Sequence, residues 1–491
     1  MLYRMAIMMS FVKSEKFQNT LKNIRSFFLT TEWMIMLCCL AGVFTTLGLQ
    51  VYGTLVFGFI VATVFLLSDD FMATLLPFLL TVMIAIHCYD SYNTFMQYKL
   101  LAIPLVLCLI LHFVFYWKPI KIQGSQFWPM VFVSASIVLG GLGFITTEEY
   151  LAPTSLYHMA GLGFGMVFLY LLFFANIETK KDYSLINMLT KIMVIAGLFG
   201  SFMVFSFYVI NINKVLDIRG LLFLQWRNNL STLLMIALPF TFLLASRKSY
   251  ATILGFVFFL AILLTGSRGG MVFGGIELGM CIVMYTLYDK RRRVAYIFIC
   301  SFILLGVLIF FRQFIEFFGY TINRLFEAIN DFLMGESSEI RAIHCARGIN
   351  DYLNHPIFGT GLGYMGNRDI HASKEFSLCW YHCEPIQIAA SFGTLGIIAF
   401  IVQFISRNML IWRKVTLFNI TVFISYIGLE LMSLVNPGIF CPLPYLMLIT
   451  LLLVIVEKCD TGEYQERISL FKRRKMRKVQ NNENSKIVKI G

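Results

Sequence analysis

The chain has 491 residues, of which 58% are hydrophobic and only 14% are charged. This composition excludes an ordinary soluble domain, in which about a quarter of the residues are charged. The formal net charge of +13 does not indicate nucleic-acid binding, because the Lys and Arg residues gather in short loops and tails, as they do on the cytoplasmic side of membrane proteins.

Apolar runs long enough to cross a bilayer recur along the whole chain, and the mean hydropathy is +0.76. A membrane-spanning helix needs about 20 such residues. The sequence therefore predicts an all-α, polytopic membrane protein with about 12–14 transmembrane helices. The expected spans lie near 32–48, 50–67, 70–88, 100–117, 127–145, 156–176, 188–211, 221–245, 250–264, 269–288, 294–312, 385–405, 415–434 and 439–457.

The basic loops predict the orientation of these spans. Basic segments occupy alternate junctions between consecutive spans. They are the N-terminal tail, "KPIK", "ETKKDY", "SRKS", "DKRRRV", "SRNMLIWRK" and the tail "FKRRKMRK". All of them therefore face one side, which the positive-inside rule makes cytoplasmic. We expect a cytoplasmic tail at 1–31, transmembrane helices at 32–312, a long external loop at 313–384, further transmembrane helices at 385–457 and a basic cytoplasmic tail at 458–491.

The stretch "AILLTGSRGGMVFGGIELGM" places Arg268 between two apolar runs, beside Gly266, Gly269 and Gly270. In the predicted topology this joint lies at the external membrane boundary. A boundary arginine either extends toward lipid headgroups or holds an anion at the membrane surface, and the sequence leaves both interpretations open.

The external loop at 313–384 contains two amphipathic stretches, "FRQFIEFFGYTINRLFEAINDFL" and "SSEIRAIHCARGINDYLNHP". We expect them to form a helical cap over the external face. Next comes "HPIFGTGLGYMGN", in which Gly359 and Gly361 either form a turn or expose backbone amides to an anion or sugar. His382 and Glu384 then stand at the mouth of the following span, where the histidine is either an interface residue or a catalyst and the carboxylate suits a helix N-terminus.

In combination these motifs resemble the O-antigen ligase and O-antigen polymerase superfamily of bacterial membrane enzymes. The order "TGSRGG", "EIRAIHCARGINDYLNHPIFGTGLGYM", "HCEPIQIAASFGTLG" matches that superfamily over roughly residues 220–457. The chain departs from the common pattern at Cys383, where asparagine is frequent, and at Ser391, where an acidic residue is frequent.

The resemblance implies a glycosyltransferase that moves a glycan from undecaprenyl diphosphate to a sugar or lipid A core acceptor on the external leaflet of the bacterial inner membrane. It implies no cofactor and no metal, since arginines stabilise the diphosphate leaving group. By match to the family, the expected catalytic residues are His382, Arg268 and Arg341, and His382 acts either as a general base or as a hydrogen-bond donor to the diphosphate. The expected substrate-binding residues are Arg227, Asn229, Arg347, Gly359, Gly361 and Glu384.

Several alternatives stay open at this point. The motifs do not separate a ligase from a polymerase. A metal-dependent lipid-phosphosugar transferase is disfavoured, because the first external loop has no acidic pair. A lipid-linked glycan flippase or other transporter would favour charges within the spans. A zinc site formed from His344, Cys345, Cys379, His382 and Cys383 lacks a standard spacing, and a disulfide among the three cysteines is a minority interpretation.

Overall fold

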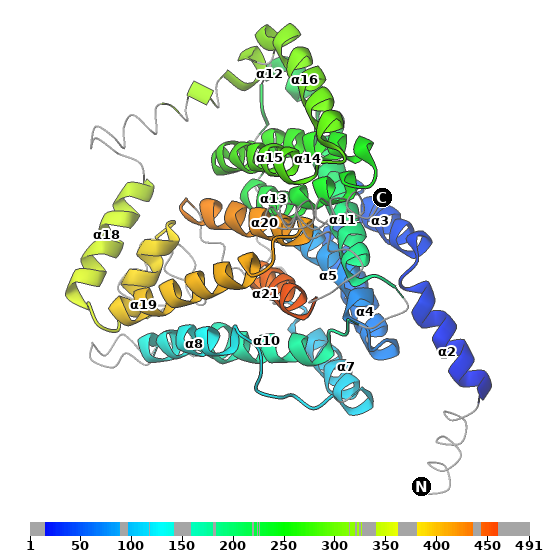
Figure 1. Cartoon of the computed structure of the whole chain (residues 1–491), viewed down its shortest axis with the longest axis vertical. Helices are drawn as coiled ribbons and strands as arrows, with labels where there is room; N and C mark the ends of the chain where they lie inside the picture. Colours follow the sequence, from blue (N-terminus) through cyan, green and yellow to red (C-terminus); the bar gives the residue numbers. More distant parts are fainter. Residues whose placement is uncertain are drawn as a thin grey trace, which may run out of the picture.

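The computed structural model describes residues 15–88, 97–116, 118–141, 159–179, 183–218, 220–222, 224, 226–313, 315–319, 322–323, 326, 340–361, 381–435 and 443–459. These residues form helices and connecting turns, and none of them lies in a strand (Figure 1). The all-α fold expected from the composition is therefore confirmed.

The longer helices have the following bounds in chain order: α2 (Glu15–Phe27), α3 (Thr31–Thr46), α4 (Gln50–Leu67), α5 (Phe71–Ile86), α7 (Ala102–Phe115), α8 (Phe127–Gly141), α10 (Gly165–Asn176), α11 (Leu185–Ile210), α12 (Ile212–Ile218), α13 (Arg227–Ala245), α14 (Thr252–Leu264), α15 (Arg268–Tyr288), α16 (Arg293–Ile309), α18 (Ile340–Asn354), α19 (Glu384–Trp412), α20 (Leu417–Ser433) and α21 (Leu443–Lys458). Short helical turns cover Lys99–Leu101, Met159–Phe164 and Ser249–Ala251.

Six helices in the described part of the chain are long and apolar enough to cross a membrane, or up to eight if each of two bent helix pairs forms one span. Five shorter apolar helices of 10–17 residues accompany them. The expected count of 12–14 includes every apolar run, and some of these runs contain helices shorter than 18 residues. The expected span at 100–117, for example, contains a helix of 14 residues.

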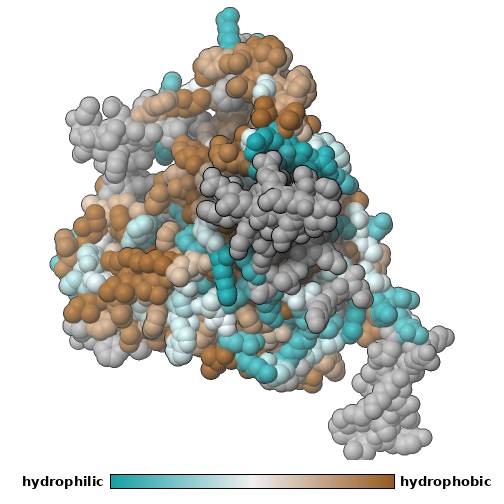
Figure 2. All heavy atoms as spheres, viewed as in Figure 1, coloured by the Kyte–Doolittle hydropathy of each residue, from teal (hydrophilic) through white to brown (hydrophobic). Residues whose placement is uncertain are grey.

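The centre of the bundle is α13, which packs against α11, α14, α15 and α20. Nearly all of its side chains from Leu230 to Leu243 are buried, because a helix that is apolar on every side is stable only when other helices or lipid surround it. Outer helices such as α7 and α16 instead expose many large apolar side chains, and Figure 2 shows hydrophobic surface over the region of α16. This distribution fits a bundle whose outer surface contacts lipid.

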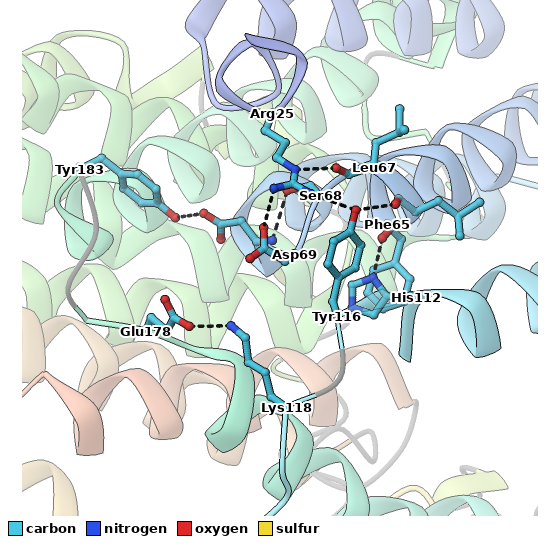
Figure 3. Close-up of polar contacts among 12 residues, drawn as sticks. Arg25, Phe65, Leu67, Ser68, Asp69, His112, Tyr116, Lys118, Glu178 and Tyr183 are labelled. Atoms are coloured by element: carbon cyan, nitrogen blue, oxygen red, sulfur yellow. Dashed lines mark hydrogen bonds and ion pairs between the residues drawn. The ribbon is translucent and has the colours of Figure 1, made fainter. Parts of the chain in front are cut away.

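Three contacts each join helix junctions that the charge pattern assigns to the same side of the membrane. At the predicted cytoplasmic end, Lys118 pairs with Glu178 at 2.6 Å, and the Tyr183 hydroxyl donates to Asp70 at 2.5 Å (Figure 3). At the predicted external end, the ring of His87 lies 4.6 Å from that of Trp226. Junctions assigned to the same side of the membrane therefore contact one another.

Candidate active site

The helix that follows His382 is broken near its start. Gly393 in α19 has φ 63° and ψ −160°, which is not a helical conformation. A side chain there would be strained and would overlap the backbone of Ile357, so the break requires glycine. It separates a first segment of about ten residues from a second segment that is long enough to cross most of a membrane.

The loop that precedes α19 by about 25 residues docks its backbone onto this break. The amide of Thr360 donates to Ala390 O and that of Gly361 to Ser391 O, both at 2.8 Å, and the amide of Thr394 donates to Pro356 O at 2.7 Å. A helix interior has no spare carbonyls for such bonds, but the break frees them. The loop and the two parts of α19 therefore form one rigid unit.

Gly359 and Gly361 both belong to this unit. Each has a positive φ, 70° and 79°, and a side chain at Gly359 would overlap the backbone of Ser391. Their amides donate to backbone carbonyls, Gly359 N to His355 O and Gly361 N to Ser391 O. The structure thus gives these glycines a packing role, and their proposed contact with substrate stays a prediction.

Helix α18 packs against the first segment of α19 and brings the predicted cap to His382. The Tyr381 hydroxyl donates to Asp351 at 2.5 Å, and the ring of Tyr381 lies against Gly348. The imidazole rings of His344 and His382 are stacked 5.5 Å apart. Residues nearly forty positions apart thus form one compact layer around His382.

His382 has φ 56°, and it is the one non-glycine residue with a positive φ in the described part of the chain. This conformation costs about 1–3 kcal/mol and is frequently retained at functional sites. The next residue, Cys383, is partly buried, which raises the pKa of its thiol. Glu384 begins α19 and is buried, where the helix dipole favours its carboxylate.

Arg341 and Arg347 both lie in α18. The side chain of Arg341 lies outside the described part, and Arg347 is half-buried. The structure therefore places the backbone of both arginines in the helix that covers His382, as expected for the cap.

The second group of predicted residues lies at the starts of α13 and α15. Arg268 is the first residue of α15, and Ser267 before it caps the helix by accepting from the Gly270 amide. The Ser267 hydroxyl also donates to Asn228 at 2.8 Å, which ties the Arg268 turn to the start of α13. Arg227 begins α13, and the Tyr445 hydroxyl donates to the Asn229 carbonyl at 2.9 Å.

A cavity of about 300 Å³ lies between α19 and the end of α20. One side is formed by α19 from Glu384 onward, and the other by the end of α20, including Ser433 and Leu434. Gly269, next to Arg268, lies against Met432 and Val435 in the same end of α20. The cavity therefore lies between the helix that begins after His382 and the helix end that supports Arg268.

Two charged residues that the sequence analysis did not assign to the site line this cavity, Arg407 and Glu430. They form an ion pair with a distance of 3.1 Å. Arg407 belongs to the motif "SRNMLIWRK", which was expected in a cytoplasmic loop. The structure places it inside α19, paired with the last turn of α20, so this expectation was wrong for Arg407.

No group of three or more His, Cys, Asp or Glu residues suited to a metal ion occurs among the residues that the structure describes. Cys345 and Cys383 form no disulfide with another described residue, and Cys379 lies outside the described residues. The Cys345 thiol contacts the Tyr381 carbonyl at 3.5 Å, so packing of α18 on α19 accounts for its position.

Residues 250–401 match the family model described as O-antigen ligase. The match begins just before α14 and extends into α19, so it includes Arg268, Arg341 and His382. No curated protein and no solved structure matches the chain.

Proposed function

We propose that the chain, whose residues 250–401 match the family model of O-antigen ligases, is a membrane glycosyltransferase of the external leaflet. It moves a glycan from undecaprenyl diphosphate to a sugar acceptor, either as a polysaccharide polymerase or as a ligase that transfers to lipid A core. The bacterial cytoplasmic membrane is the proposed location, with both termini in the cytoplasm. The observation that carries the proposal is the strained His382, which stacks on His344 of α18 and lies just before α19, the helix that forms one wall of the cavity.

The proposed reaction is a displacement at the anomeric carbon of the donor. The acceptor hydroxyl oxygen bonds to this carbon while the bond from the carbon to the diphosphate oxygen breaks. His382 either takes the hydroxyl proton or donates a hydrogen bond to the diphosphate. Attack from the face opposite the leaving group inverts the anomeric centre.

Negative charge develops on the diphosphate as it leaves, and arginine suits this charge because its planar guanidinium forms paired hydrogen bonds to phosphate. We assign this role to Arg268 and Arg341. Arg227, Asn229 and Arg347 are assigned to substrate binding around them. With the charge stabilised in this way, the reaction needs no divalent metal.

The direct test is transfer by the purified full-length protein in detergent. Undecaprenyl-diphosphate-linked glycan is supplied as donor, and the products are resolved by electrophoresis and mass spectrometry. Longer glycans on undecaprenyl diphosphate identify a polymerase, whereas glycan on added lipid A core identifies a ligase. If neither product forms with any donor supplied, the proposal is overturned and a transporter is favoured. A vesicle translocation assay would then detect the transport.

The same assay tests the expected independence from metals. We expect most of the activity to persist in excess EDTA, because the arginines carry out the charge stabilisation that a metal would otherwise provide. Complete loss of activity, restored by magnesium or manganese, would move the protein to a metal-dependent class of transferase.

A further inference from the structure

The cavity of about 300 Å³ between α19 and the end of α20, called the α19–α20 cavity below, is lined by the charged pair Arg407 and Glu430. The reaction described above does not use this pair. Arg407 is 3% exposed, and its guanidinium lies over the ring of Tyr426 at 4.8 Å and beside Glu430 at 3.1 Å. Its Nε has no hydrogen-bond partner among the described residues. A buried donor without a partner costs about 1–3 kcal/mol, so this atom is suited to a ligand.

The pair joins the later part of α19 to the last turn of α20. Glu430 lies three residues before the last residue of α20, and this end of α20 leads to Ser433 and Leu434 at the cavity wall. Arg407 lies five residues before Trp412, the last residue of α19. Both residues of the pair line the same cavity as Glu384.

A tether between two helices is the simplest alternative for such a pair. However, a buried ion pair is often no more stabilising than apolar residues of similar volume, because both charges lose their hydration. A tether also gives no reason for a cavity beside the pair.

The charges of the cavity indicate which ligand it binds. Among the described residues that line it, two carboxylates, those of Glu384 and Glu430, and one guanidinium, that of Arg407, carry charge. Together they offer both acceptors and donors to neutral hydroxyl groups. Phe400 and Phe404 line the walls between the charged ends, and such apolar faces suit the face of a sugar ring.

A second cavity provides a comparison. It has a volume of about 590 Å³ between α4, α5, α7, α10 and α21, and no charged residue lines it. Its walls suit an apolar chain, whereas the α19–α20 cavity is smaller and charged at both ends. A volume of about 300 Å³ is at the lower end for small-molecule sites, which fits one short sugar segment.

We propose that the α19–α20 cavity is the acceptor-sugar subsite, and that Arg407, positioned by Glu430, binds hydroxyl groups of the acceptor. This inference rests on the proposed transferase function. Ile401 and Phe404, at the outer wall, are about half exposed, so the cavity opens sideways toward the membrane. A lipid-carried acceptor arrives from that direction.

The kinetic test varies donor and acceptor separately in the purified full-length protein. Arg407→Lys keeps the charge but loses the planar fork, and Glu430→Gln keeps the shape but loses the charge. We expect each to raise the acceptor KM about 10–100-fold, as loss of a hydrogen bond to a charged group predicts, with the donor KM unchanged. Arg413→Lys, at the exposed end of the same helix, is the matched control and should leave both constants unchanged.

A second pair of variants tests the cavity without touching the ion pair. Ile397 lines the cavity, whereas its neighbour Ile398 does not and is 55% exposed. Ile397→Trp should fill the cavity and raise the acceptor KM, while Ile398→Trp adds the same bulk outside and should not. If donor and acceptor constants rise together in Arg407→Lys, and Ile397→Trp behaves like Ile398→Trp, the pair is only a tether and the subsite is overturned.

A binding measurement separates failure of this inference from failure of the proposed function. The probe is the acceptor sugar without its lipid, which is the oligosaccharide released by mild acid from the lipid-linked glycan for a polymerase and the core oligosaccharide for a ligase. Saturation-transfer NMR detects it on the wild-type protein and on Ile397→Trp without any turnover. Contact in the wild type that is lost in Ile397→Trp supports the subsite even if no transfer occurs. Transfer by the wild type with equal contact in both proteins overturns the subsite and leaves the transferase function intact.

Discussion

The two ends of the helix bundle are built in different ways. At the predicted cytoplasmic end, side chains from separate junctions satisfy one another: Arg25 contacts Asp69 and the Leu67 carbonyl, and Lys118 pairs with Glu178 (Figure 3). At the predicted external end, a loop docks onto a broken helix through backbone hydrogen bonds and leaves a cavity beside it.

The difference suggests that the predicted cytoplasmic end only closes the bundle, whereas the predicted external end holds the candidate site. Exposed ion pairs between flexible side chains contribute little stability, but they close a surface and need no precise geometry. Backbone docking through glycines is rigid, and it fixes the start of α19, which follows His382 and its uncommon positive φ. Substitutions should therefore affect activity strongly at the external end and weakly at the other.

The largest effect is expected at His382. His382→Ala should lower turnover about 10²–10⁴-fold, the usual range for a proton-transfer group. His382→Asn is the sharper variant, because asparagine tolerates a positive φ but cannot serve as a base. We expect it to be folded and at least as stable as the wild type by thermal unfolding in detergent, yet as inactive as the alanine variant.

His355 provides the control for this prediction. Within the described part of the chain, its hydrogen bonds are made by its backbone, whose carbonyl accepts from the Gly359 amide. His355→Ala should therefore remain active. Near-normal turnover in both His382 variants would return His382 to an interface role.

The next largest effect is expected at the two arginines assigned to the diphosphate. Lysine at Arg268 or Arg341 keeps the charge but loses the paired hydrogen bonds, so we expect a loss of about 2–4 kcal/mol of transition-state stabilisation. That corresponds to about 30–1,000-fold in kcat/KM, measured with the lipid-linked donor. Normal rates in both variants would exclude the diphosphate assignment.

Arg347 provides an internal control for Arg341. It follows six residues later in α18, and at about 100° per residue it points roughly 120° away from Arg341. Arg347→Lys should have the milder effect. The reverse ranking would transfer the diphosphate role to Arg347.

A smaller effect, on stability first, is expected at the break in α19. Gly393→Ala would place a side chain against Ile357 in a strained conformation, at a cost of at least about 1–3 kcal/mol. We expect a lower thermal midpoint and reduced activity. Gly306→Ala is the control, because nothing lies within 4 Å of the added methyl group and alanine favours a helix. Equal midpoints for the two variants would mean that the docked loop is not rigid.

Helix positions were largely predictable from the sequence, because apolar runs and basic loops define spans directly. The expected span at 269–288 is α15 from Arg268 to Tyr288. The expected span at 385–405 instead continues to Trp412, since the break at Gly393 divides the helix and moves its membrane-crossing part about eight residues later. Arg407 was misplaced for this reason.

The sequence proposes members for the candidate site, but it does not predict how the site is built. The motif order points to His382 and the glycines around it, and the family match includes His382, while their roles stay predictions. Hydrogen bonds between the backbones of Gly361 and Ser391 depend on tertiary contact, which no local pattern encodes. The pairing of Arg407 with Glu430 likewise joins two helices whose relative position is not determined by hydropathy.

The smallest effect is expected at the opposite end, in the pair of Lys118 and Glu178, which are 24% and 53% exposed. A double-mutant cycle with Lys118→Gln and Glu178→Gln should give a coupling energy of about 0.2–1 kcal/mol in thermal or denaturant unfolding, and salt should reduce it. Transfer activity should be unchanged in all three variants, because this end lies across the bundle from His382. The same cycle on Arg407 and Glu430 should show stronger coupling, since a buried charge left without its partner is costly. Two results would contradict this comparison of the two ends. One is a coupling at Lys118 and Glu178 as strong as that at Arg407 and Glu430, and the other is a loss of transfer activity in the Lys118 and Glu178 variants.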